Sequence, residues 1–162
     1  MFMNITEICT FSLFILVGTI ISLLFSAKPA YGALPPLSEN ERQESCQYIV
    51  IATVLDVTSE VIPVDMGTDI KFTAIVKVEN VTENQSFNSW YPEQLQATLQ
   101  PPIVDQEIKV TYFQTGDRPD GWVGPGGQYS SLYQGLKAKL YLNQSLDGTF
   151  NLIEPNGIDK LS

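Results

Sequence analysis

Histidine is absent from the 162 residues, and cysteine occurs only twice. Without histidine the chain can form neither a histidine-dependent catalytic triad nor a histidine metal site. Positive charge is also scarce, since 9 lysines and arginines face 18 acidic residues and the formal net charge is −9. Such a chain repels nucleic-acid phosphates and anionic lipid headgroups. We therefore expect no nucleic-acid partner, no metal site and no cofactor.

The long apolar run near the N-terminus carries no charge from residue 8 to residue 27. It is followed by Ala30-Tyr31-Gly32, with small residues at the two positions that a signal peptidase reads. These features predict a signal peptide over residues 1–32. The alternative is an uncleaved membrane anchor, because Glu7 and no lysine or arginine precede the run, which at about 20 residues could just span a bilayer. Either way, we expect the domain to be exported to a periplasmic, lumenal or extracellular compartment, in contact with a membrane only if the segment is retained.

Residues 33–45 are polar and marked by Pro35 and Pro36, and they are predicted to form a tether with at most a short helical turn. Residues 46–162 are then one domain, large enough to bury a core. Cys9 would leave with the signal peptide, so Cys46 could form no internal disulfide. As a lone cysteine at the head of an apolar strand, it is interpreted as a core residue.

Five strands are predicted from the alternation of apolar and polar residues. The first is apolar on both faces, and the others bury one face. Residues 63–69 supply turn residues for a longish hairpin loop between the first two strands, while residues 88–100 fit a short helix or a strand equally well. The predicted strands are 46–58, 70–78, 107–113, 136–142 and 149–153.

This pattern, with no long helical segment, predicts an all-β domain. We expect a small five- to six-stranded antiparallel barrel that is OB-fold-like, with a β-sandwich as the alternative. Closure into a barrel would hide the edges of the two long opening strands.

The order of these elements resembles the netrin-module and metalloprotease-inhibitor type of secreted OB-fold domain. The matching segments are the opening strand 46–54, the strands 72–78 and 108–112, and residues 135–142 before a final hairpin. The disulfides of that family are absent, and its inhibitors coordinate a protease zinc through an N-terminal cysteine, whereas Cys46 lies well inside the mature chain. The resemblance therefore implies a fold and not that inhibitory mechanism.

The loop 116–129 is rich in glycine and also contains aromatic residues. It is predicted to bind a partner, because loops on a rigid scaffold commonly carry binding sites. In the alternative hypothesis, Trp122 plugs one end of the barrel. Two carboxylates of the loop could contact calcium, but two are too few to satisfy the ion. The candidate binding residues are Trp122 and Tyr129, with flat rings, and Asp117, Arg118 and Asp120, with polar groups.

The leading functional hypothesis is a non-catalytic binding or accessory module with a protein or glycan partner. The first alternative is a hydrolase or carbohydrate-active enzyme that uses Asp105, Asp117 and Asp120. A pocket holding two carboxylates about 5 to 9 Å apart would favour this alternative. The second alternative is a structural subunit tethered to a membrane.

Overall fold

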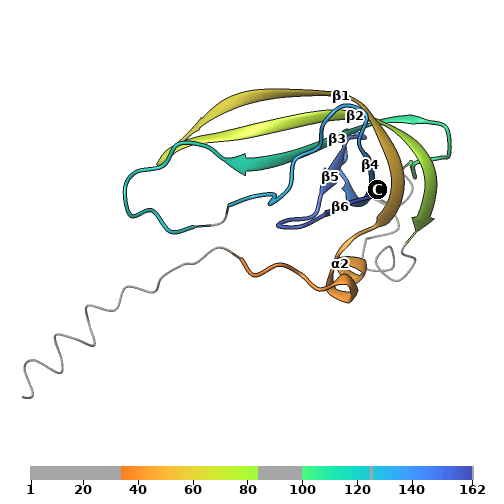
Figure 1. The fold of residues 1–162 in the computed structure, drawn as a ribbon, viewed down its shortest axis with the longest axis horizontal. Coiled ribbons are helices and arrows are strands. Elements are labelled where there is room, and N and C mark those ends of the chain that lie inside the picture. Colours follow the sequence, from red (N-terminus) through yellow and green to blue (C-terminus); the bar gives the residue numbers. More distant parts are fainter. Residues whose placement is uncertain (1–33, 84–99, 125, 162) are drawn as a thin grey trace, which may run out of the picture. The chain divides into compact units, whose positions relative to one another are not determined.

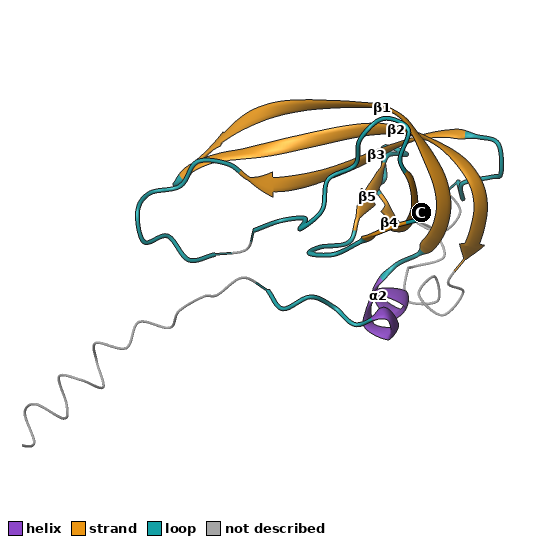
Figure 2. Cartoon of the chain, in the orientation of Figure 1, coloured by secondary structure: helices purple, strands orange, loops and turns teal. Residues whose placement is uncertain are grey.

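The structure is a computed structural model that describes residues 34–83, 100–124 and 126–161. The predicted signal peptide and nearly all of the ambiguous segment 88–100 lie outside these residues. Figure 1 labels the elements and Figure 2 colours them by type. They are α2 (Glu39–Ser45), β1 (Tyr48–Val64), β2 (Gly67–Glu83), β3 (Glu107–Thr115), β4 (Lys137–Gln144), β5 (Phe150–Leu152) and β6 (Ile158–Lys160).

The six strands form one sheet in the order β1-β2-β3-β5-β4-β6, and β4 also pairs with β1. Five strands therefore close into a barrel-like ring, which confirms the predicted all-β fold. The sheet is mixed and not purely antiparallel, because β3 and β5 pair in parallel. A closed ring with an odd number of strands needs at least one parallel pair, so this part of the prediction was wrong for a geometric reason. The strand β6 pairs with β4 outside the ring.

The opening hairpin is longer and its turn is tighter than predicted. Strands β1 and β2 each span 17 residues, and only Asp65 and Met66 separate them. Gly67 closes the turn with a φ of +119°, a conformation that favours glycine. Pro63 fits within β1 because an edge strand tolerates proline, and β4 pairs with β1 only as far as Thr53.

The core fills the ring with the inward residues of β1, β2, β3 and β4. The predicted inward positions of the strands 107–113 and 136–142 are confirmed, since their apolar residues are buried. Tyr48 packs edge-on against Phe150, and Tyr112 stacks on Phe72. Residues that are fully buried include Val50, Ala52, Ala74, Val76, Val78, Val110, Ala138, Leu140 and Leu142.

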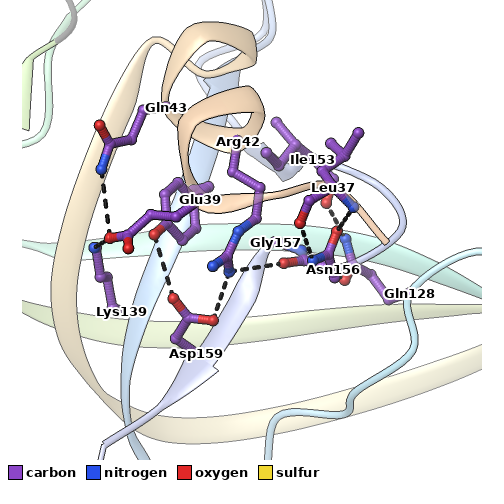
Figure 3. A network of polar contacts seen from close by, with 11 residues as sticks. Leu37, Glu39, Arg42, Gln43, Gln128, Lys139, Ile153, Asn156, Gly157 and Asp159 are labelled. Carbon is purple, nitrogen blue, oxygen red and sulfur yellow. Dashed lines mark hydrogen bonds and ion pairs between the residues drawn. The ribbon is translucent and has the colours of Figure 1, made fainter. Parts of the chain in front are cut away.

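The segment 33–45 was predicted as a tether, but its second half is bound to the domain (Figure 3). Ser38 caps α2 in a reciprocal capping box with Glu41. Arg42 forms an ion pair with Asp159 and lies 4.5 Å from the centre of the Tyr141 ring. The main-chain nitrogen of Leu37 donates a 2.9 Å hydrogen bond to Asn156. The ordered domain therefore starts before Cys46, through contacts with residues between 99 and 119 positions away.

No helix among residues 34–83, 100–124 and 126–161 is long and apolar enough to cross a membrane.

Candidate functional site

The loop 116–129 is hydrogen-bonded to the sheet at both ends. At its start, Thr68 and Asp117 exchange two 2.9 Å hydrogen bonds, from the Thr68 nitrogen to the Asp117 carbonyl and from the Asp117 nitrogen to the Thr68 hydroxyl. At its end, the nitrogen of Gln128 donates a 2.8 Å hydrogen bond to the carbonyl of Phe113. The loop therefore leaves β3 toward the tip of the opening hairpin and returns alongside β3.

Arg118 fixes the middle of this loop. Its guanidinium forms an ion pair with Asp69 at the start of β2 and donates to the carbonyl of Thr68. It also lies 4.8 Å from the centre of the Trp122 ring, within the range of a cation–π interaction. The Arg118 side chain is only 12% exposed. Partial burial strengthens these charged contacts relative to a surface ion pair, so the loop has a defined position over the sheet.

A pocket of about 330 Å³ lies between the loop and the end of β3. Its wall combines two aromatic rings with two carboxylates and one guanidinium. Phe113 faces away from the core and is 39% exposed, so its ring is open to a ligand. The residues that line the pocket are Asp69, Phe113, Gln114, Thr115, Arg118, Trp122, Gly127 and Glu154.

Glu154 brings a second carboxylate into the pocket from the segment after β5. The residue is exposed overall, yet partial burial of its carboxyl group raises its pKa, and the charge of Asp69 raises it further. Within the described part of the chain, this carboxylate takes part in no hydrogen bond or ion pair. It is therefore the polar group of the pocket that is left for a ligand.

Replacing Glu154 with glutamine should stabilise the protein at neutral pH and not in acid. Because the folded-state pKa of Glu154 is raised, folding favours the protonated form, and wild-type stability falls as pH rises through that pKa. Below the ordinary pKa of glutamate both states are protonated, and the advantage of the variant vanishes. Urea denaturation at pH 7 and pH 3.5 measures this, with Glu107→Gln, an exposed position outside the pocket, as the control. An equal shift at both pH values would contradict the assignment.

The structure brings together only part of the predicted binding set. Arg118 and Trp122 line the pocket, whereas Asp117 and Asp120 are exposed and do not line it. Tyr129 is exposed outside the pocket, and its hydroxyl donates to the carbonyl of Leu34. Trp122 is half-buried and lies outside the main core cluster, which disagrees with the hypothesis that it plugs the barrel.

Apart from Arg118 and Trp122, the residues that line the pocket were not predicted as binding residues, among them Phe113, Asp69 and Glu154. Phe113 carried the only usable signal, because it is a large aromatic at an outward position of an alternating strand. Asp69 was interpreted as a turn residue of the opening hairpin, and Glu154, which follows the predicted last strand 149–153, was given no role. Their closeness depends on the ring, which places β5 beside β3.

Among the acidic residues of the predicted hydrolase, Asp105 lies far from Asp117. The nitrogen of Asp105 bonds to Val78 and that of Asp117 to Thr68, so the two lie ten residues apart along β2. At about 3.3 Å per strand residue, this is about 33 Å measured along the strand. Within residues 34–83, 100–124 and 126–161, no group of three or more metal-ligating side chains could hold a metal ion.

Cys46 and a second surface hollow do not have the properties of a catalytic or binding site. Cys46 is buried against Tyr141 and Ile153, and burial raises the pKa of its thiol to about 11, so the reactive thiolate is scarce at neutral pH. A second hollow of about 390 Å³ lies on the strand surface around Thr58 and Lys71. Its lining has no aromatic residue, and Lys71 already pairs with Glu60.

Comparisons of the chain with protein-family models, with curated proteins and with solved structures find no match. The resemblance to netrin-type domains and the export of the chain therefore stay predictions. We therefore infer a function from the pocket beneath the loop 116–129.

Proposed function

We propose that this chain is an exported, non-catalytic binding module that captures its partner in the pocket beneath the loop 116–129. The observation that carries this proposal is the contrast between two halves of the pocket. Arg118, Asp69 and Trp122 satisfy one another and hold the wall in place. Phe113 and Glu154 face the same space with an open ring and a carboxylate that has no hydrogen bond or ion pair among the described residues.

This arrangement favours binding because the wall is already ordered before a ligand arrives. A preformed site avoids the entropy cost of ordering loops and side chains upon association. An aromatic ring with a few placed polar groups is the usual composition of such pockets. The uncharged run at residues 8–27 supports the export part of the proposal.

The experiment is affinity capture from an extract of the source cells, with the tagged protein as bait and mass spectrometry as readout. Phe113→Ala should lose the captured partner, because it removes the open ring and, at a 39% exposed position, little core packing. The matched control is Tyr133→Ala, an aromatic residue that is 55% exposed outside the pocket. Retention of the partner by Phe113→Ala, or equal loss in both variants, would contradict the proposal.

A hydrolase is the second candidate, because the pocket holds two carboxylates with different environments. The raised pKa of Glu154 suits a general acid, while Asp69 forms an ion pair with Arg118. Binding is favoured over catalysis since the ion pair engages Asp69 in holding the loop. Hydrolysis of chromogenic glycosides that is abolished by both Glu154→Gln and Asp69→Asn would reverse this preference.

A further inference from the structure

The pocket already contains one cation between an aromatic ring and a carboxylate. The guanidinium of Arg118 lies over the Trp122 ring and pairs with Asp69. Ring quadrupoles attract cations, and a carboxylate supplies the counter-charge and hydrogen-bond acceptors. The protein therefore uses this combination of groups to hold a guanidinium at this place.

A second combination of the same kind lines the same pocket without a cation of its own. Phe113 offers an open ring, and Glu154 offers a carboxylate that has no hydrogen bond or ion pair among the described residues. Two cations of the protein nearby already have other carboxylate partners, since Arg118 pairs with Asp69 and Lys71 with Glu60.

The charge of the site points in the same direction. Asp69 and Glu154 against Arg118 leave the pocket with one excess negative charge, and the chain as a whole carries −9. A negative field of this kind attracts cationic ligands and repels anionic ones. A neutral ligand would leave the charge of Glu154 uncompensated.

We propose that the pocket binds an organic cation, an alkylguanidinium or alkylammonium group, against Phe113 and Glu154. This inference rests on the proposed function and names the ligand chemistry of the same pocket. The group could belong to a lysine or arginine side chain of a partner protein or to a small free amine. In both cases the alkyl part would lie against the ring and the charged end against the carboxylate.

Titration calorimetry of the full chain in a nonionic detergent tests this inference, at matched ionic strength. The probes are n-butylguanidinium chloride, the neutral isostere n-butylurea, and the capped peptide acetyl-Gly-Arg-Gly-amide. We expect n-butylguanidinium to bind at least about tenfold more tightly than n-butylurea. Binding of the peptide as well would indicate a protein side chain as the source, and binding of n-butylguanidinium alone a small amine.

Two variants assign the binding to the pocket. Glu154→Gln should weaken n-butylguanidinium binding by about tenfold or more, because it removes the counter-charge and keeps the shape. Glu107→Gln, an exposed position outside the pocket, should leave the affinity unchanged. Equal affinity for n-butylurea, or unchanged affinity in Glu154→Gln, would overturn the inference.

The test of cation binding can fail without the test of the proposed function failing. If Phe113→Ala loses the captured partner but the wild type binds no cation, the cation inference falls and the binding module stands. If Phe113→Ala keeps the partner, the proposed function itself falls.

Discussion

Replacement of Leu140 with alanine is expected to lower the free energy of unfolding by about 2 to 5 kcal/mol. Leu140 is fully buried and lies on β4 opposite Val50 of β1 and Ile158 of β6. The cost combines the lost burial of the side chain with the cavity that remains. Because this residue joins the ring to the outer strand, little rearrangement can fill that cavity. Denaturant unfolding followed by circular dichroism measures the change.

The control for this prediction is the same substitution at Leu146, which is 75% exposed. Leu146→Ala should change the free energy of unfolding by less than about 0.5 kcal/mol. Lys139→Ala should also cost far less than Leu140→Ala, since Lys139 pairs with Glu39 at a partly exposed site. Similar midpoints for Leu140→Ala and Leu146→Ala would show that the inward face of β4 is wrongly assigned.

Replacement of Gly127 with alanine is expected to cost about 2 to 5 kcal/mol and to abolish the pocket. Gly127 has a φ of +66°, and an added Cβ would lie 2.3 Å from the carbonyl oxygen of Phe113. That oxygen accepts the 2.8 Å hydrogen bond from Gln128 that returns the loop to β3. The variant must therefore move the loop end away from the sheet. Thermal and denaturant unfolding measure the loss, and partner capture measures the pocket.

Gly121 of the same loop is the matched control. It also has a positive φ, of +76°, but nothing lies within 4 Å of an added Cβ. Gly121→Ala should therefore cost only the conformational penalty, about 1 to 2 kcal/mol, and keep the captured partner. If Gly121→Ala were as damaging as Gly127→Ala, the close approach of the loop to β3 would not be what constrains position 127.

Much of the fold follows from local pattern. Alternation predicted the inward faces of β3 and β4, because the ring buries one face of each strand. The outer face is buried only in places, as at Tyr141 of β4. The strand β6 was missed since three residues, Ile158 to Lys160, are too few to show a period. The segment 33–45 was misread as a tether because its binding to the domain depends on a distant residue. The capping box of Ser38 can be seen in the sequence, but the pairing of Arg42 with Asp159 cannot.

Only part of the candidate site was predictable, for a similar reason. A glycine-rich loop that keeps a tryptophan is unusual within a short stretch of sequence, and it led to Arg118 and Trp122. Asp69 and Glu154 are ordinary acidic residues in their local context. They become part of a site only because β2, β3 and β5 are neighbours in the ring. The sequence separation between Asp69 and Glu154 hides that relation from any local pattern.

Site-specific photocrosslinking tests whether the captured partner sits against Phe113. The photoreactive residue p-benzoylphenylalanine, placed at position 113 in one protein and at position 133 in another, keeps an aromatic ring at both exposed positions. After irradiation in an extract of the source cells, we expect a covalent adduct with the captured partner at position 113 and none at position 133. An adduct at position 133 alone, or adducts of equal yield at both positions, would contradict it.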